Sequence, residues 1–375
     1  MVSAYLWELL LFPMIPSDIA SLRLYNQHLS QADFTRLQDV VAWLGAVQSQ
    51  DYAGAKWSLG VRMGQTTDVV IDQAFNDGSI LRTHVLRPTW HFVTPADIRW
   101  LLMLTAPRVH GVNGTMYRQV GLDAALFSQC AEVIVQALQG GQSLTRDELR
   151  HHLQQAGLDP TPPLRMTYIV MWAELEQIIC SGPRRGKQFT YMLLDERVPF
   201  VVPLTHEEAL AELSRRYFVS RGPATIADFA KWSGLTLTEA RQGLEAVKDH
   251  LEQVQIGEQT YWMPPTVAIE PSTLSQAYLL SIYDEIVSGY KDRSAIGEAE
   301  VGAKLVEMGN ALTNFILLDG RIVGTFRREL KKKSVIIETN LFRALQAGEE
   351  EAVFAAANQY SAFLQLPVQL TGIEP

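Results

Sequence analysis

The order of predicted helices and strands repeats along this chain, and the repetition constrains its fold more than any other feature. Thr205 and Glu208 have the spacing of a capping box and begin a helix with one apolar face. Gly222 and the proline after it end that helix, and two shorter helices follow, the second of which begins with a capping box at Thr236 and Glu239. An alternating segment around Gly257 then predicts a hairpin. Three helices followed by a hairpin is the order of a winged helix-turn-helix.

The same order occurs twice more toward the N-terminus. Residues 127–193 contain a helical pattern, a capping box at Thr145 and Glu148, a third helix and a hairpin. The third helices of these two copies share one apolar spacing. A less regular copy covers residues 37–93, where three helical patterns precede a strand-like segment. Repetition at this length predicts a tandem array, here of three winged helices.

The C-terminal part has a different pattern. Residues 314–341 alternate with period two around an Asp319-Gly320 turn, and an amphipathic helix follows. The predicted fold class is therefore α+β, with three tandem winged helix-turn-helix units followed by a small C-terminal antiparallel β domain with a helix. The expected domains are residues 1–110, which include a leading segment, then 111–200, 201–268 and 269–375.

Composition is typical of a globular protein. The 375 residues are 47% hydrophobic and 19% charged, which allows two to four domains with buried cores. Cys130 and Cys180 lie far apart, without a CxxC motif or clustered histidines, so we expect no zinc site, no disulfide and a reducing cytoplasm. An apolar segment near the N-terminus is too short to span a bilayer, contains Glu8 and lacks the basic flank of a signal peptide. No membrane partner is expected.

The net charge of -9 argues against a partner held by bulk electrostatics, so any nucleic-acid surface must be a local basic patch. Two segments with several basic residues could grip phosphates. They are Arg184, Arg185 and Lys187 at a predicted hairpin tip, and Arg327, Arg328, Lys331, Lys332 and Lys333 at a strand end and turn. The alternative is that both are solvated turns, because charged turns are common on any protein surface.

Five segments, in this order, resemble the winged-helix DNA glycosylases related to AlkZ and YcaQ. They are "LGAVQSQDYAGAKWSLGVR", "LRPTWHFVTPADIRWLL", "RRYFVSRGPATIADFAKWSGL", "YDEIVSGYKDRS" and "LDGRIVGTFRREL". The resemblance extends over nearly the whole chain. It implies tandem winged helices with a C-terminal β domain, and excision of alkylated purines or unhooking of alkylation crosslinks. The implied partner is damaged double-stranded DNA, with no metal or cofactor required.

The catalytic signature of that family is a glutamine, an apolar residue, then glutamine or aspartate. Gln48, Ser49 and Gln50 occupy the matching positions, with a polar serine in the middle. A purine alkylated at N7 or N3 is cationic and departs readily, and the transition state places positive charge on the sugar. A glutamine carbonyl is neutral, but it can accept a hydrogen bond from water and point its dipole at the developing cation. The resemblance therefore makes Gln48 and Gln50 the candidate catalytic residues.

Two such amides can serve one water only if the backbone between them is extended, because residues two apart on a helix point about 200° apart. We therefore expect the helix before Gln48 to end by about Val47 and the next helix to begin at Asp51. Both amides should face a cleft between the first winged helix and the remaining domains. The alternative is a polar helix end that bonds only to backbone groups.

Several neighbouring residues have two readings. Asp51 could be a general base, but an N-cap is the simpler interpretation. His84 and His91 could contact the lesion or a phosphate, although a histidine on a half-buried strand is usually structural. The same choice applies to aromatic residues that could either stack a displaced base or belong to the core, namely Trp57, Trp90 and Phe92. A last set matches the family pattern and suggests a buried ion pair or loop tether: Asp284, Glu285, Asp292 and Arg293.

Two functions of different class follow. The first is a monofunctional DNA glycosylase that acts through water, since the signature contains no lysine to form a Schiff base with the sugar. The second is a non-catalytic winged-helix DNA-binding regulator or scaffold, because a fold alone does not determine function.

Overall fold

The computed structural model describes residues 16–265, 274–297, 301, 303 and 314–373. The first of the three repeated segments, here called the first unit, covers residues 37–93. It contains three helices and a three-stranded sheet of order β1-β3-β2. Its elements are α2 (Leu37–Leu44), β1 (Val47–Gln48), α3 (Tyr52–Gly60), α4 (Asp68–Asp77), β2 (Leu81–His84) and β3 (Trp90–Val93).

The second unit, residues 124–193, has the same order of elements and the equivalent sheet order β4-β6-β5. It consists of α6 (Ala124–Leu138), β4 (Leu144–Thr145), α7 (Arg146–Gln155), α8 (Arg165–Leu175), β5 (Ile179–Ser181) and β6 (Thr190–Leu193). In the third unit, residues 206–263, an isolated bridge between Ala224 and Trp262 takes the place of the short first strand. That unit consists of α10 (His206–Arg221), α11 (Ile226–Ser233), α12 (Leu237–Val247), β7 (Glu252–Ile256) and β8 (Gln259–Met263).

Capping boxes begin the helices where the sequence predicted them. In each box a threonine oxygen accepts from a backbone N–H of the first turn, while the acidic side chain accepts from the threonine N–H, so two donors without helical partners are satisfied. The predicted boxes at Thr145, Thr205 and Thr236 are all present, and Thr225 with Asp228 adds one at α11. These local signals explain why the helix starts were predictable.

The C-terminal sheet has five strands in the order β13-β12-β11-β10-β9 and is covered by one long helix. The elements are β9 (Ala277–Leu280), β10 (Asn314–Leu318), β11 (Arg321–Leu330), β12 (Val335–Leu341), α15 (Glu349–Leu364) and β13 (Val368–Thr371). The turn predicted at Asp319-Gly320 is present, with both residues at positive φ. The prediction of an entirely antiparallel domain is wrong at β13, which pairs in parallel with β12. The reason is that α15 returns the chain to the starting end of β12 before β13 begins.

Among the described residues, further helices lie between or beside these parts, including α1 (Pro16–Asn26), α5 (Ile98–Gln119), α9 (Leu194–Arg197) and α13 (Glu285–Ser288). The boundary expected between residues 110 and 111 falls inside α5, because this helix continues without a break from the first unit toward the second. Among the described residues, no single helix has the length and apolar composition to cross a membrane; α5 and α6 meet that test only as a pair bent by 100°.

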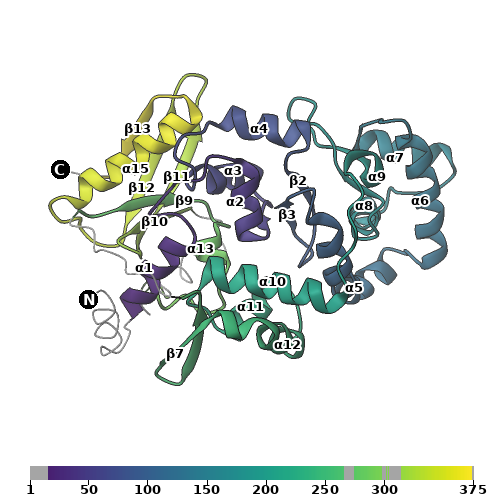
Figure 1. Cartoon of the computed structure of the whole chain (residues 1–375). Coiled ribbons are helices and arrows are strands. Elements are labelled where there is room, and N and C mark those ends of the chain that lie inside the picture. The colour runs from purple at the N-terminus through teal and green to yellow at the C-terminus, as the bar shows by residue number, and fades with distance from the viewer. Residues whose placement is uncertain (1–15, 266–273, 298–300, 302, 304–313, 374–375) are drawn as a thin grey trace.

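Figure 1 shows the first unit in the middle of the molecule, with the C-terminal sheet on one side and the second unit on the other. One large buried cluster joins the first unit, the third unit and the C-terminal sheet, through residues such as Leu44, Leu213 and Ile316. The second unit has a separate cluster around Phe127 and Leu149. The first and third units and the sheet therefore share a core that surrounds the Gln48 segment.

Two adjacent acidic residues at the start of α13 tie these parts together. The Asp284 carboxylate accepts from both terminal nitrogens of Arg62 in the first unit, at 2.8 and 2.9 Å, and from the Ser58 hydroxyl at 2.5 Å. The Glu285 carboxylate accepts from Arg221 of the third unit at 2.6 Å. All four charged side chains are fully buried. The buried ion pair expected for this segment is thus confirmed at Asp284 and Glu285.

The Asp284 carboxyl stays ionised although it is buried. Burial alone would raise the pKa of Asp284, but the charge and hydrogen bonds of Arg62, with further bonds from Ser58 and the Ile286 N–H, hold it below its ordinary value. A buried charge of this kind depends on its partner, because removal of one member leaves the other uncompensated.

We expect Asp284→Ala to destabilise the fold strongly, because it would leave the Arg62 guanidinium buried without a counter-charge. Loss of one partner of a buried ion pair costs about 3–5 kcal/mol. Thermal and urea unfolding followed by circular dichroism measure the change. The matched control is Asp195→Ala, whose pair with Arg99 has a carboxylate that is 85% exposed; exposed pairs contribute about 0–1 kcal/mol. Equal losses in the two variants would contradict a tether at Asp284.

Candidate active site around Gln48

The backbone at Gln48–Gln50 has the break that the sequence predicted. Helix α2 ends at Leu44, and Gly45 follows with φ of 73°, a left-handed conformation that glycine adopts without strain. The chain then forms the short strand β1 through Gln48, and α3 begins after Asp51. A continuous helix through this segment is therefore excluded. The strand ends at Gln48, and the chain bends at Gln50 before α3 begins.

The two glutamine side chains have different surroundings. Gln50 is exposed, whereas Gln48 is only 8% exposed. The Oε1 atom of Gln48 accepts a hydrogen bond from Nη2 of Arg87 at 3.2 Å. Because the guanidinium can only donate, this contact fixes which end of the amide is the carbonyl. One of the two lone pairs of the carbonyl oxygen is thus engaged.

The backbone N–H of Gln48 forms its hydrogen bond with a side chain that lies outside the sheet of the first unit. Strand β1 is an edge strand, and the Gln48 N–H donates to Oε1 of Glu285 at 3.0 Å instead of to a neighbouring strand. The other carboxylate oxygen of Glu285 accepts from Arg221 and from the indole of Trp232, at 2.6 and 2.9 Å. Arg221 also donates to the carbonyls of Leu44 and Ala46, at 2.7 and 3.1 Å.

The Arg221–Glu285 pair therefore contacts the chain just before and at Gln48. Reasoning from sequence did not assign this role to either residue. Both lie in segments that carry the family resemblance, "RRYFVSRGPATIADFAKWSGL" and "YDEIVSGYKDRS", and that was the only available signal.

Ser49 is fixed through its backbone. Its N–H donates to the Trp90 carbonyl at 2.7 Å, and its carbonyl accepts from Arg82 at 3.1 and 3.2 Å. Arg82 is itself buried under the Trp90 ring, at 4.3 Å from its centroid, and burial lowers the pKa of Arg82 to about 10. The buried Ser49 hydroxyl has no hydrogen-bond partner among the described residues. An apolar side chain at this position would therefore lose no side-chain hydrogen bond.

Asp51 is at the N-cap position of α3, but the prediction that its side chain caps the helix is wrong. Its Oδ2 instead accepts from Arg328 of β11 at 3.1 Å. A charge-assisted bond to a guanidinium is stronger than a bond to a neutral N–H, which explains the choice. Arg328 also donates to the Tyr360 hydroxyl at 2.7 Å. Strand β11 and α15 are thereby connected to the chain next to Gln50.

The two histidines weighed from sequence are buried and hydrogen-bonded. His84 pairs through Nδ1 with Glu174 of the second unit. Nδ1 of His91 lies 2.9 Å from the Thr89 carbonyl, and burial holds the pKa of His91 well below its ordinary value. A neutral His91 must donate from Nδ1 to that carbonyl, which leaves Nε2 as an acceptor without a described partner.

The aromatic candidates divide in a similar way. Trp57 and Phe92 belong to the core, at 2% and 0% exposure. Trp90 is half-buried, with its ring 4.2 Å from that of His84. Among these three residues, only Trp90 has an exposed part that a displaced base could reach. Arg82 and His84 already contact its ring, so a base could stack only on ring surface that they leave uncovered.

Four of the eight basic candidates already pair with carboxylates. Arg184 contacts Asp72 at 3.5 Å and lies over the Tyr52 ring. Arg185 pairs with Glu148 at 2.8 Å, and its hydrogen bonds help to lower the pKa of Glu148 to about 2. The other two pairs are Arg328–Asp51 and Lys331–Glu329. The exposed candidates without an ion pair among the described residues are Lys187, Arg327, Lys332 and Lys333.

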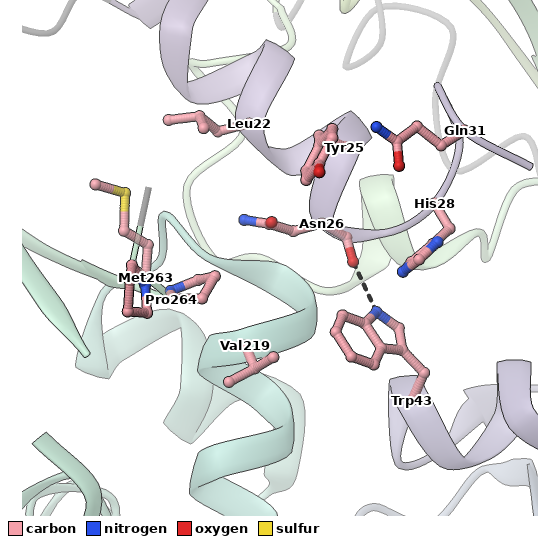
Figure 2. Close-up of a pocket in the computed structure, with 10 residues that line it drawn as sticks. Leu22, Tyr25, Asn26, His28, Gln31, Trp43, Val219, Met263 and Pro264 are labelled. Carbon is pink, nitrogen blue, oxygen red and sulfur yellow. Dashed lines mark hydrogen bonds between the residues drawn. The ribbon is translucent and has the colours of Figure 1, made fainter. Parts of the chain in front are cut away.

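A pocket of about 270 Å³ lies between α1, α2, α10 and the end of β8 (Figure 2). The Trp43 indole, which donates to the Asn26 carbonyl at 2.7 Å, forms one wall together with Tyr25 and His28. None of the described residues that line it was predicted from the sequence. Within the described part of the chain, no group of three or more histidine, cysteine, aspartate or glutamate side chains is placed to hold a metal ion.

Comparison with known proteins covers almost the entire chain. The AlkZ-like DNA glycosylase family model matches residues 41–363. The interstrand DNA cross-link repair glycosylase of Streptomyces sahachiroi is 24% identical over 374 residues, covering 93% of this chain and 97% of that protein. The solved structure of Streptomyces sahachiroi DNA glycosylase AlkZ aligns with a TM-score of 0.78 and 19% identity, over 96% of this chain and all of that chain. The chain therefore belongs to the AlkZ-like DNA glycosylase family.

Proposed function

We propose that this protein is a monofunctional DNA glycosylase that hydrolyses the N-glycosidic bond of alkylated purines, including those in interstrand crosslinks. The observation that carries the proposal is the non-helical Gln48-Ser49-Gln50 segment between α2 and α3, which matches the family signature at both glutamines and is held at Gln48 by the buried Arg221–Glu285 pair. A rigid backbone matters, because a group that stabilises a transition state must already be in place when charge develops.

The chemistry requires little acid catalysis. An alkylated purine leaves as a neutral base, and the positive charge passes to the sugar as the bond breaks. The Gln48 carbonyl has a second lone pair beyond the one used by Arg87, and it can accept from the attacking water. Gln50 is exposed two residues farther along, and in this proposal its side chain turns toward the same water when DNA is bound. Both amides then orient the water without taking its proton, which passes to bulk solvent once the water oxygen has bonded to the anomeric carbon.

The three units are, in this proposal, tandem winged helices that bind damaged double-stranded DNA. Their shared order of helix, short strand, two helices and hairpin supports this interpretation. The four domains follow as residues 1–110, 111–200, 201–268 and 269–375, with α5 continuous across the first boundary. We place the protein in the cytoplasm, where its two buried free cysteines would remain reduced.

The alternative is a DNA-binding regulator or scaffold of the same family that does not hydrolyse the N-glycosidic bond. One observation favours it: the Gln48 carbonyl already accepts from Arg87, and Gln50 is exposed, so the two amides do not meet around a preformed cavity. The two functions differ in a direct measurement, which is release of the alkylated base.

We expect Gln48→Ala and Gln50→Ala each to lower the rate of base release by about a hundredfold, the typical loss when one preorganised group is removed from a transition state. The assay is a duplex that contains N7-methylguanine, with alkali to cleave at the abasic site. Gln142→Ala removes an exposed glutamine of the second unit and is the control. Full activity in the Gln48/Gln50 double variant would contradict the assignment, provided that its melting temperature and duplex affinity match the wild type.

A second prediction concerns the basic candidates. Neutralising Arg327, Lys332 and Lys333 together should weaken duplex binding and flatten its salt dependence, with a loss of slope of about one for each phosphate contact. Neutralising Arg184 and Arg185 should have less effect on the slope, because Asp72 and Glu148 already balance their charge. Fluorescence anisotropy across a salt series measures both. An unchanged slope in the triple variant would remove that hairpin from the DNA interface.

A further inference from the structure

Two positively charged residues from different parts of the chain, Arg87 and Lys231, are joined by a hydrogen bond beside Gln48. Arg87, in the loop between β2 and β3, donates from Nη1 to the Lys231 carbonyl and from Nη2 to Gln48 Oε1, each at 3.2 Å. Lys231, on α11 of the third unit, donates from Nζ to the carbonyls of Ser288 and Tyr290, each at 2.9 Å. Arg293 lies close enough to Lys231 to affect its ionisation.

Among the described residues, no carboxylate oxygen lies within 4.0 Å of Arg87, Lys231 or Arg293. The charges of Glu285 and Asp228 act on Lys231 from farther away, and Glu285 also acts on Arg87. Both acids already pair with other arginines, Glu285 with Arg221 and Asp228 with Arg23.

Like charges held together raise one another's free energy unless an anion binds among them. Burial, and then the charges of Arg293 and Arg87, lower the pKa of Lys231 to about 8. Burial also lowers the pKa of Arg87. By contrast, Arg184, Arg185 and Arg328 are neutralised by carboxylates of the chain itself. Lys231 and Arg293 are exposed and Arg87 is half-buried, so a ligand can reach these side chains.

We propose that Arg87 and Lys231 form a binding site for a DNA phosphodiester next to Gln48. The site rests on the proposed function, because it requires DNA as the substrate. A phosphodiester provides anionic oxygens in the geometry that a guanidinium binds through two parallel hydrogen bonds. It would place the sugar of the adjacent nucleotide near the signature segment.

Binding of the DNA backbone at this site would also change the hydrogen bonding of the Gln48 side-chain amide. A phosphate that binds Arg87 competes with Gln48 Oε1 for the same guanidinium. Arg87 then withdraws from the amide, and both lone pairs of the Gln48 carbonyl become available to water and to the developing cation. In this way the amide is freed only when the DNA backbone is in place.

The test uses Arg87→Gln and Lys231→Gln in the full chain, because glutamine removes the charge but keeps a donor for the contacts that Arg87 and Lys231 make. The measurement is anisotropy of an undamaged duplex over a salt series. Each variant should lose about one unit of the slope of log affinity against log salt. Arg36→Ala, which removes a 70% exposed arginine at the start of α2, should keep the wild-type slope. Arg87→Lys should restore the slope that Arg87→Gln loses.

A wild-type slope in both glutamine variants overturns the proposal, as does a wild-type chain that does not bind duplex. Melting temperature in inorganic phosphate, against chloride at equal ionic strength, separates a free anion from the DNA backbone. A phosphate shift that the variants lose, with an unchanged duplex slope, also overturns it. Because the duplex is undamaged, a chain that binds it with the predicted slopes but releases no N7-methylguanine contradicts the proposed function and leaves the phosphate site standing.

Discussion

The buried ion pair between Arg221 and Glu285 determines where Gln48 lies. Its carboxylate satisfies the outward N–H of an edge strand, and its guanidinium satisfies two carbonyls at the end of α2. A buried N–H or C=O without a partner costs free energy comparable to a lost hydrogen bond, so few other arrangements of this loop are possible. The pair comes from the third unit and from α13, both far from Gln48 in sequence. The candidate site therefore exists only when three separate parts of the chain are packed together.

Other arginines near Gln48 also satisfy groups from distant parts of the chain. Arg62, just after α3, pairs with Asp284, the neighbour of Glu285. Arg82 donates to the Ser49 carbonyl, and Arg328 donates to Asp51. Each of these arginines satisfies or balances a group that would otherwise be isolated near the signature. Arg82 and Arg87 differ from the other two, because their hydrogen-bond partners are neutral. Arg82 is buried and Arg87 is half-buried, so of these two Arg87 is the one whose charge a ligand can reach.

Local features of this fold could be predicted from sequence, and distant ones could not. The capping boxes, the repeated order of elements and the break before Asp51 depend on residues a few positions apart, and each is present. The contacts that build the site join residues far apart, such as Gln48 with Glu285, and no local pattern encodes their distance. Asp51 is an example of a contact that local sequence could not predict. Its position matches an N-cap, but its carboxylate accepts a hydrogen bond from Arg328 of the C-terminal sheet.

We propose that Gln48 presents its carbonyl to a water at the sugar of the damaged nucleotide. A crystal structure of the protein with a duplex that contains an abasic-site analogue would test this. We expect a water within about 2.6–3.2 Å of Gln48 Oε1, facing the anomeric carbon of that sugar. Gln50 should contact the same water while Glu285 keeps its bond to the Gln48 N–H. A complex in which the abasic sugar lies away from residues 48–50 would contradict it.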